Sequence, residues 1–453
     1  MKQYDFIIGY EHKQREIESV CLLKYELERR GYTVLIYNTN DQRLKEHIRS
    51  YDTEVLLLPY AYDDKIVSFC TRRAISFNKL INLQWEQAIY KQQEEDADSY
   101  RNPSGICKKA VQLSWGSANV RRLIDVVGID SRRVKLVGNV TLDFLKNPLR
   151  SYYMPKEDIC RQYNIPSDKK ICLFIASFKS AQADEEELTE LCRLYGEWRR
   201  EQKEVALRTM NTILDWIQTA LDSDRELYFI YRPHPGEKTT IVDEIQKNCE
   251  RFIVIKDLSV KQWILIADKI YTWMSTTVAE VYFAQKGCYI LYPYKLPEEA
   301  LGRLTDKMKY ISEYKAFQFS LNSQTDDFPI DIETLNEYYT IDQSMSYVKI
   351  ADVCEEILRN PYYQIETGDL KRIYKMATQG KSFIKKVNLY LWQLDWFYNL
   401  FWKVTAKLSL KGKYFEKKRY DRISYEKWKK EEVASEEEIQ RIYARIIQCI
   451  EKI

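Results

Sequence analysis

The strongest constraint in this sequence is a regular alternation of apolar runs of strand length with amphipathic stretches of helical length. It opens with a strand at Tyr4–Gly9, a helix at Gln14–Arg30 and a strand at Thr33–Tyr37. Further strands are expected at Glu54–Pro59, Leu80–Trp85, Ala110–Trp115 and Val134–Val137. Such alternation favours a parallel sheet with helices on both faces. Because the pattern repeats later in the chain, we expect an α/β fold with two Rossmann-like domains.

The length of 453 residues fits two domains of ordinary size with an appended piece. A polar stretch with three prolines, at residues 146–170, is the best candidate for the connection between them. We therefore place an N-terminal domain at residues 1–150, a second domain at 151–360 and a helical extension at 361–453. Within the second domain, residues 182–221 are expected to form one long helical stretch, whose acidic start suits the helix dipole.

Several classes of protein are excluded by composition. Glycine is scarce, at 13 residues, and neither G-x-G-x-x-G nor G-x-x-x-x-G-K-[ST] occurs, so the usual nucleotide-binding glycine motifs are absent. The ten cysteines form no C-x-x-C pair and the three histidines are His12, His47 and His234, which argues against a zinc site. No signal peptide precedes the first strand, so we expect a cytoplasmic chain with reduced cysteines.

Two candidate phosphate ligands end the apolar run that starts at Glu226. They are Arg232 and His234, and prolines on both sides of the histidine restrict its backbone. In open α/β sheets, ligands bind beyond the carboxyl ends of the strands. An arginine offers a planar fork of donors to a phosphate, and a histidine donates a hydrogen bond or transfers a proton near neutral pH. The plainer alternative is a histidine that only shapes a turn.

A second polar group follows another strand, about forty residues later. Ser275, Thr276 and Thr277 precede a helix that carries Glu280. Hydroxyls at a helix start cap the helix or donate to a phosphate, and free N–H groups there attract anions. An ordinary helix cap and a solvated surface carboxylate are the plainer alternatives. The occurrence of both polar groups at strand ends of one α/β run favours a shared site for an anionic ligand.

Three parts of the sequence resemble bacterial surface-polysaccharide transferases of the GT-B architecture. They are the string YRPHPGE with MSTTVAE and GCYILYP, the opening GYEHKQREIESVCLLKYELERRGYTVLIYN, and the segment WGSANVRRLIDVVGIDSRRVKLVGNVTLDFL. The opening looks like the start of surface carbohydrate biosynthesis proteins. The resemblance implies two facing Rossmann-like domains, with the acceptor on the first and a nucleotide-activated donor on the second. Related enzymes use CMP-linked acidic sugars such as Kdo or sialic acid, and others use CDP-glycerol.

The resemblance also implies roles for single residues. In the CMP-sugar enzymes an HP motif and a Ser/Thr motif hold the nucleotide phosphate, which corresponds to His234 and to residues 275–277. Glu280 matches the carboxylate that often binds the ribose hydroxyls of the donor. The sequence departs from glycerophosphate polymerases at Tyr271–Met274, where these tend to have an Asp and a Tyr before two Ser. The departure favours a CMP-linked sugar over CDP-glycerol.

Glycosyl transfer with inversion needs a base for the acceptor hydroxyl, and transfer with retention needs a carboxylate nucleophile or another shield. Glu86, directly after the strand INLQW, is the first candidate, and Glu16, in a helix just after the first strand, is the second. His234 is a further candidate for proton transfer. An acidic residue in a first helical turn often serves only the helix dipole, which is the structural alternative for the two carboxylates.

The region near the C-terminus is basic and aromatic. Residues 371–430 hold 17 Lys or Arg against 4 Asp or Glu, and their longest apolar part is too short for the roughly 20 apolar residues of a spanning helix. Residues 383–430 therefore predict either a helix on an anionic membrane surface or one packed across both domains. The final residues predict an amphipathic helix that folds back or pairs with another subunit.

These observations predict a cytoplasmic glycosyltransferase that needs neither a metal nor a cofactor, with peripheral docking on the inner membrane leaflet as an option. The enzyme would pass a sugar from a nucleotide-activated donor, CMP-linked by preference, to a growing surface polysaccharide or a lipid-linked glycan. The alternatives are a CDP-glycerol- or ribitol-type polyol-phosphate transferase, a catalytically silent GT-B scaffold in capsule assembly, and a sugar-nucleotide epimerase. No nucleic-acid partner is expected.

Overall fold

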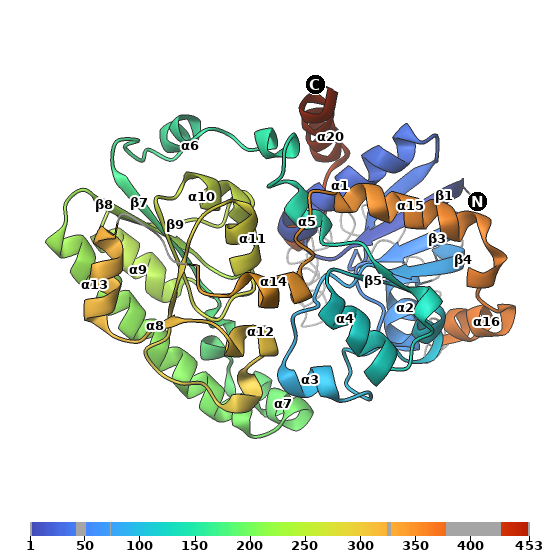
Figure 1. Cartoon of the computed structure of the whole chain (residues 1–453), viewed down its shortest axis with the longest axis horizontal. Coiled ribbons are helices and arrows are strands. Elements are labelled where there is room, and N and C mark those ends of the chain that lie inside the picture. Colours follow the sequence, from blue (N-terminus) through green and yellow to red (C-terminus); the bar gives the residue numbers. More distant parts are fainter. Residues whose placement is uncertain (1, 42–50, 73, 324–327, 377–426, 452–453) are drawn as a thin grey trace, which may run out of the picture.

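Two parallel sheets stand side by side in the computed structural model, which describes residues 2–41, 51–72, 74–323, 328–376 and 427–451 (Figure 1). The first sheet has the strand order β2-β1-β3-β4-β5-β6. Its strands are β1 (Lys2–Tyr10), β2 (Val34–Asn38), β3 (Tyr51–Leu58), β4 (Ile75–Asn82), β5 (Val111–Ser114) and β6 (Val134–Leu136). Adjacent strands all run parallel, so their carboxyl ends share one edge.

The second sheet has the order β12-β11-β10-β7-β8-β9, and its adjacent strands are also parallel. Its strands are β7 (Lys170–Ile175), β8 (Leu227–Arg232), β9 (Phe252–Val254), β10 (Lys269–Thr272), β11 (Tyr289–Leu291) and β12 (Tyr310–Ile311). The chain continues from β7 and from β10 in opposite directions along the sheet. Such a switch point opens a crevice beyond the carboxyl ends of the two strands.

The predicted fold class is confirmed: the chain is α/β, with two Rossmann-like sheets in the GT-B arrangement. The strands predicted in the first half all overlap observed ones. The largest deviation concerns Leu80–Trp85, since β4 begins earlier and ends at Asn82. Gln84 has φ 48°, a left-handed conformation that an extended strand excludes, and it turns the chain out of the sheet.

Helices cover both faces of the first sheet. They are α1 (Lys13–Arg29), α2 (Asp64–Thr71), α3 (Lys91–Glu95), α4 (Ser117–Arg121) and α5 (Val140–Asp143). In α1, Val20, Leu23 and Leu27 recur at helical spacing and are completely buried. This apolar stripe packs α1 against the first sheet. Because α1 begins three residues after β1 ends, its first turn lies at the carboxyl edge of the sheet.

The helices of the second half are α6 (Lys156–Gln162), α7 (Glu185–Tyr195), α8 (Trp198–Ser223), α9 (Thr240–Asn248), α10 (Val260–Ile266), α11 (Val278–Phe283), α12 (Arg303–Asp306), α13 (Tyr314–Asn322) and α14 (Ile332–Tyr338). The long helix predicted at residues 182–221 is in fact two helices. Gly196, with φ 112°, ends α7, and α8 begins two residues later.

The chain returns to the first half after α14. Helix α15 (Ser346–Arg359) lies against α1, α5 and β3, and α16 (Thr367–Met376) lies against α2. Asp143 accepts hydrogen bonds from the first N–H groups of α15, those of Ser346 (3.0 Å) and Tyr347 (2.8 Å). The division at residues 150 and 360 stays a prediction, but the described helices after Ser346 pack against elements of the first half.

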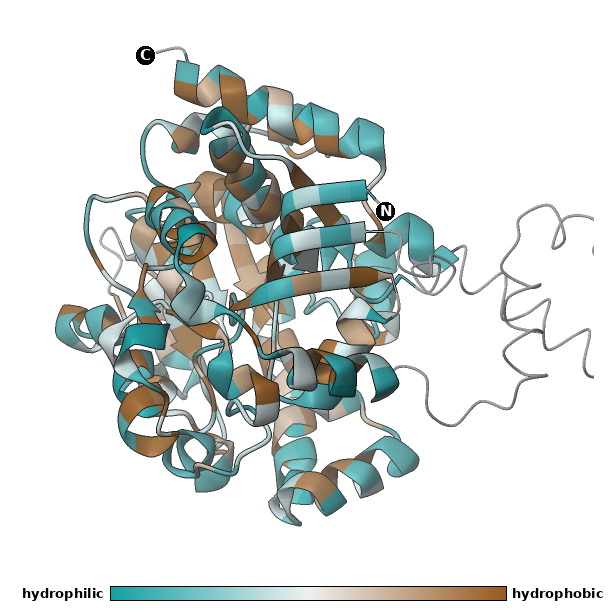
Figure 2. Cartoon of the chain, turned by 90° about the vertical axis from the view of Figure 1, so that its right-hand side faces the viewer, coloured by the Kyte–Doolittle hydropathy of each residue, from teal (hydrophilic) through white to brown (hydrophobic). Residues whose placement is uncertain are grey.

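The last described helix, α20 (Glu436–Glu451), is amphipathic and folds back onto α1. Ile442, Ile446 and Cys449 form its buried stripe, and Figure 2 shows apolar and polar residues alternating along this helix near the C label. Of the two arrangements predicted for the chain end, folding back is the one observed.

The basic aromatic segment predicted at residues 383–430 lies almost entirely outside the described residues. Its interpretation as a membrane-surface helix therefore stays a prediction. Within the described ranges, no helix is both long and apolar enough to span a bilayer. All ten cysteines lie within the described ranges, and nine of them are buried.

Contacts between the halves border the space between the two carboxyl edges. The backbone N–H of Lys91 donates to the carbonyl of Leu301 (3.1 Å), and a Cβ atom on the next residue, Gly302, would lie 2.7 Å from the carbonyl oxygen of Ile89. A Cβ atom on Gly116 would lie 2.2 Å from another carbonyl of the opposite half. These glycines let the halves approach each other closely.

Candidate functional site

A cavity of about 360 Å³ lies between the halves, where the carboxyl ends of both sheets meet. The first-half wall comes from the start of α1, the segment after β4 and the residues around the start of α5. The second-half wall comes from the loop after β8, the turn after β10 and the residues around α12. A volume of this size is in the range of small-molecule sites.

Five of the predicted site residues line this one cavity. Glu16 and Glu86 come from the first half, and His234, Thr276 and Glu280 come from the second. The other three, Arg232, Ser275 and Thr277, lie within two residues of lining residues in the chain but are not among them. The structure thus brings together carboxylates from one sheet with an imidazole and a hydroxyl from the other.

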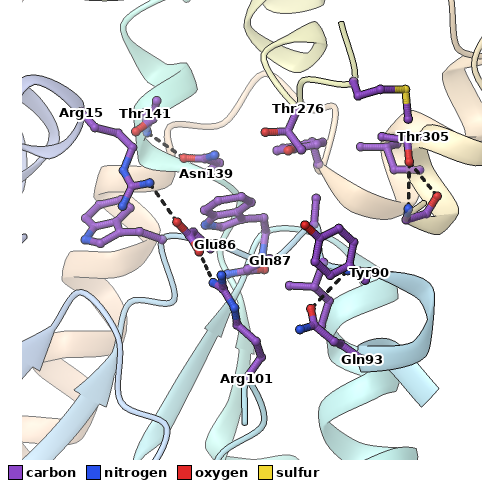
Figure 3. Close-up of a pocket in the computed structure, with 18 of the residues that line it drawn as sticks. Arg15, Glu86, Gln87, Tyr90, Gln93, Arg101, Asn139, Thr141, Thr276 and Thr305 are labelled. Carbon is purple, nitrogen blue, oxygen red and sulfur yellow. Dashed lines mark hydrogen bonds and ion pairs between the residues drawn. The ribbon is translucent and has the colours of Figure 1, made fainter. Parts of the chain in front are cut away.

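Glu86 lies between two arginines on the first-half wall (Figure 3). Arg15 Nη1 is 3.0 Å from Glu86 Oε1, and Arg101 Nη1 donates to Glu86 Oε2. The strained turn at Gln84 precedes Glu86 and directs this segment out of β4. The carboxylate therefore reaches the cavity already paired with two cations.

The two guanidiniums control the ionisation of Glu86. Burial alone would raise its pKa, but Arg101 and Arg15 outweigh burial and bring the pKa down to about 2. The carboxylate is thus ionised at any physiological pH. In this paired state it is a weak base, since an efficient general base has a pKa near the working pH.

Glu16 is buried behind Arg15, at 1% exposure. Its Oε1 accepts from Arg15 Nε (3.0 Å) and Nη2 (2.7 Å), and its Oε2 accepts from the backbone N–H of Glu11 (2.7 Å). Burial raises the pKa of Glu16, and Arg15 opposes that rise. This geometry gives Glu16 a clear local function, which is to hold the guanidinium of Arg15 in place.

His234 is exposed to the cavity from the loop after β8. Its Nδ1 accepts a hydrogen bond from the backbone N–H of Gly236 (3.2 Å), so the neutral ring carries its proton on Nε2. Burial lowers the pKa of His234, and the nearby cations Lys179 and Arg15 lower it further. At neutral pH the side chain is therefore an uncharged hydrogen-bond donor.

A buried carboxylate shapes the loop that carries His234. Glu237 is 5% exposed and accepts hydrogen bonds from Tyr231 Oη (2.5 Å), the backbone N–H of Phe178 (3.1 Å) and the backbone N–H of His234 (3.4 Å). These bonds tie the loop to β8 and to the segment after β7. The hydrogen bonds of Glu237 thus hold the loop that positions the imidazole.

Arg232 has a different environment from the one predicted. Its guanidinium donates to the carbonyl oxygens of Ile255 (3.2 Å), Asp257 (2.6 Å) and Leu258 (2.6 Å). Burial lowers the pKa of Arg232 to about 10, so it remains a cation. Its observed contacts hold the loop after β9, and its predicted role as a phosphate ligand stays a prediction without a contact to the cavity.

The three hydroxyl residues, Ser275, Thr276 and Thr277, have different environments. Ser275 Oγ donates to Thr277 Oγ1 (2.9 Å) and accepts from the backbone N–H of Thr277 (3.2 Å), which closes the turn before α11. Thr276 is exposed and lines the cavity. Met274 has φ 46° and re-aims the chain after β10. Only one hydroxyl of the three is thus presented to a ligand.

Glu280 lies one helical turn beyond this hydroxyl turn, on the cavity side of α11. Burial raises the pKa of its carboxyl, and Lys261 partly opposes the rise. Its side chain forms no ion pair with another described residue. The carboxylate therefore keeps its accepting capacity for a ligand.

Comparisons with known proteins find a likeness to solved structures only. No family model matches the sequence, and no curated protein matches it. The chain is similar in fold to S. aureus MnaA in a co-structure with UDP, at 14% identity, with a TM-score of 0.45 over 79% of this chain and 97% of that one. It is also similar to the wall teichoic acid polymerase TagF soaked with CDPG (12%, TM-score 0.49, 78% and 89%). A third is UDP-GlcNAc 2-epimerase from Methanocaldococcus jannaschii with UDP-GlcNAc and UDP (11%, TM-score 0.41, 84% and 100%).

Three site residues were not predicted from the sequence: Arg15, Arg101 and Glu237. Arg15 was hidden inside a helix that the sequence already explained as amphipathic. Arg101 follows an acidic loop segment and reaches Glu86 only through the path of that loop. Glu237 belongs to the string YRPHPGE, where an acidic residue three positions after the histidine was the available signal.

The cavity offers hydrogen-bond donors and acceptors of both charges rather than a metal-ligand set. Among the described residues, no group of three or more His, Cys, Asp or Glu side chains is placed to hold a metal ion. Its chemical options are phosphate binding through His234 and Thr276, hydroxyl binding through Glu280, and proton transfer at a carboxylate.

Proposed function

We propose that the protein transfers a glycosyl group from a nucleotide-activated donor, CMP-linked by preference, to a hydroxyl of a growing or lipid-linked glycan. One observation carries this proposal. A single cavity between two Rossmann-like sheets is lined by His234, Thr276 and Glu280 from one half and by Glu16 and Glu86 from the other. Such a site holds a donor and an acceptor against opposite walls.

The second-half wall suits the nucleotide end of the donor. The Nε2–H of His234 and the hydroxyl of Thr276 are donors for a phosphate oxygen, and they lie beyond the carboxyl ends of β8 and β10. Negative charge grows on the leaving phosphate in the transition state, where fixed donors stabilise it most. The carboxylate of Glu280 is the matching acceptor for the ribose hydroxyls.

The first-half wall suits the acceptor, because its carboxylates supply a proton acceptor. In the transfer step, a carboxylate takes the proton of the acceptor hydroxyl while the hydroxyl oxygen bonds to the anomeric carbon. The bond from that carbon to the phosphate oxygen breaks, and the nucleotide leaves with the electron pair. Glu86 is the candidate base because it faces the cavity, whereas Glu16 is buried behind Arg15.

The same arrangement counts against a catalytically silent scaffold. A scaffold needs the fold but has no reason to keep a carboxylate close to the donor wall. Here Glu86 and His234 line the same cavity, and the negative charge of Glu86 acts to raise the pKa of His234.

A thermal-shift panel of CMP, CDP, UDP and GDP tests the proposal, since a ligand that binds only the folded form raises its melting temperature. We expect CMP to give the largest shift and His234→Ala to lose most of it. His12→Ala is the matched control, since His12 lies outside the cavity between Glu11 and Glu432. A larger shift with UDP or GDP would overturn the donor assignment. No shift with any nucleotide would overturn the function.

A further inference from the structure

The first-half wall contains two guanidiniums that converge on one carboxylate. Arg15 and Arg101 each bind a different oxygen of Glu86, and the Glu86 side chain is 41% exposed (Figure 3). A carboxylate between two arginine forks is the arrangement in which proteins bind an acidic ligand. In this cavity the acid belongs to the protein itself.

Each arginine also has a partner other than Glu86. Arg15 is held by two hydrogen bonds to the buried Glu16, from Nε (3.0 Å) and from Nη2 (2.7 Å). Arg101 Nε donates to Tyr100 Oη (2.8 Å), and the Tyr100 ring packs against Tyr195 of the second half at 5.4 Å. Loss of the Glu86 charge would therefore leave two fixed cations and no acidic partner between them.

Exchange of one anion for another at such a site costs little electrostatic free energy. Removing Glu86 without a replacement would take from Arg101 its carboxylate partner and leave Arg15 paired with Glu16 and Glu11 alone, which is unfavourable. An entering carboxylate or phosphate keeps the charge count and the hydrogen bonds, while the partly exposed Glu86 side chain turns toward water. The site thus accepts an oxyanion and resists neutral ligands.

We propose that Arg15 and Arg101 form an oxyanion subsite that Glu86 fills in the free protein and that an acidic group of the second substrate takes over. The subsite selects an acidic acceptor, one that carries a carboxylate or a phosphate near the reacting hydroxyl. The identity of the ligand as an acceptor rests on the transferase function proposed above. The oxyanion subsite itself rests only on the geometry of three side chains.

The exchange also links recognition to catalysis. While paired, Glu86 cannot act as an efficient base, because two guanidiniums stabilise its ionised form. Once an acidic group displaces it, the carboxylate loses both partners and regains its affinity for a proton. The base is therefore released only when an acceptor of the right charge is bound.

Titration calorimetry with inorganic phosphate, glycerol phosphate and glucuronate tests the subsite without any nucleotide. We expect Glu86→Gln to bind at least one of these probes about tenfold more tightly than the unchanged protein, because the competing internal acid is gone. The gain should disappear in Glu86→Gln/Arg101→Gln and persist in Glu86→Gln/His234→Ala. Preference for glucuronate assigns a uronic-acid type of acceptor, and preference for the phosphates assigns a phosphorylated one.

Glu26→Gln is the matched control, because Glu26 lies on α1 outside the cavity and is also bound by two arginines, Arg29 and Arg30. An equal gain in this variant would mean that any released arginine pair binds the probes, which overturns the proposal. No gain in a folded Glu86→Gln variant, or a gain that survives Arg101→Gln, also overturns it. A gain at this subsite combined with no nucleotide binding would leave the subsite standing and remove the transferase function.

Discussion

The two walls of the cavity differ in how their polar side chains are paired. On the first-half wall, charges neutralise each other: Arg15 pairs with Glu16 and Glu86, and Glu86 also pairs with Arg101. On the second-half wall, His234 is held neutral and Glu280 has no ion pair among the described residues. The charged groups of the first wall are paired with each other, whereas His234 and Glu280 on the second wall have no ion pair among the described residues and can still bind a ligand.

This difference implies two modes of binding. A ligand on the second-half wall adds hydrogen bonds to groups that are already in place, so its affinity depends on individual donors and acceptors. A ligand on the first-half wall must replace an internal partner, so its affinity depends on charge and on competition with Glu86. Changes on the second wall should therefore alter the binding of the donor, while changes on the first wall should alter acceptor binding and turnover together.

The largest expected effect comes from Glu86→Gln, which keeps the size of the side chain but removes the base. Turnover should fall by about 10²- to 10⁴-fold, the usual contribution of a general base. The KM for an acidic acceptor should not rise, because the arginines become more accessible. Initial rates with acceptor varied at saturating donor measure both quantities. A turnover within about threefold of the unchanged enzyme would remove Glu86 from the reaction and leave the first wall as a binding surface only.

The sequence predicted the second wall better than the first, for a physical reason. His234 and Thr276 follow strands of one parallel sheet, and the carboxyl ends of such strands share an edge whatever the loops do. Glu86 was predicted in the same way from its place after β4. These placements need only the alternation of strands and helices, which the sequence shows clearly.

The partners of these residues depend on loop paths that no local pattern determines. Arg101 meets Glu86 across a chain separation of 15 residues. Arg232 has the same position at a strand end as a phosphate ligand would have, yet it bonds to three carbonyl oxygens of the loop after β9. The amphipathic pattern of α20 fits a partner subunit as well as α1, so the sequence left both open.

The next effect, His234→Ala, tests the second wall. Loss of a fixed donor to the leaving phosphate should lower turnover by about 10²-fold, as removal of one oxyanion donor does in other enzymes. His234→Asn places an amide N–H near the same point and should recover part of the loss. Rates of donor consumption by the three proteins give the comparison, with His12→Ala as the variant that should keep full turnover. If Asn and Ala variants are equally slow, hydrogen-bond donation is not what the ring supplies.

A smaller effect is expected from Glu280→Gln on the same wall. The amide keeps one acceptor oxygen but loses the charge that favours two ribose hydroxyls, so the KM for the donor should rise by about three- to tenfold with little change in turnover. Donor variants that lack a ribose hydroxyl should lose this sensitivity. Glu244→Gln, at a surface carboxylate with 63% exposure, is the control and should leave both constants unchanged. A fall in turnover without a change in KM would move Glu280 from ribose binding to the reacting centre.

The smallest expected effect separates the walls by pH. His234 has a pKa below its usual value of 6.5, so it gains a proton only as the pH falls below that value, and the resulting imidazolium binds phosphate more tightly. Affinity for the methyl ester of CMP, whose single charge does not titrate, should therefore rise by about threefold on acidification through this pKa. The ion pairs of Glu86 contribute no change in this window, because its pKa is about 2 and both arginines stay charged. His234→Asn should abolish the rise. A rise that persists in this variant would assign the titration to Glu280 on the second wall or to Glu16 on the first, whose pKa values are raised by burial, and would remove His234 as the group that separates the walls by pH.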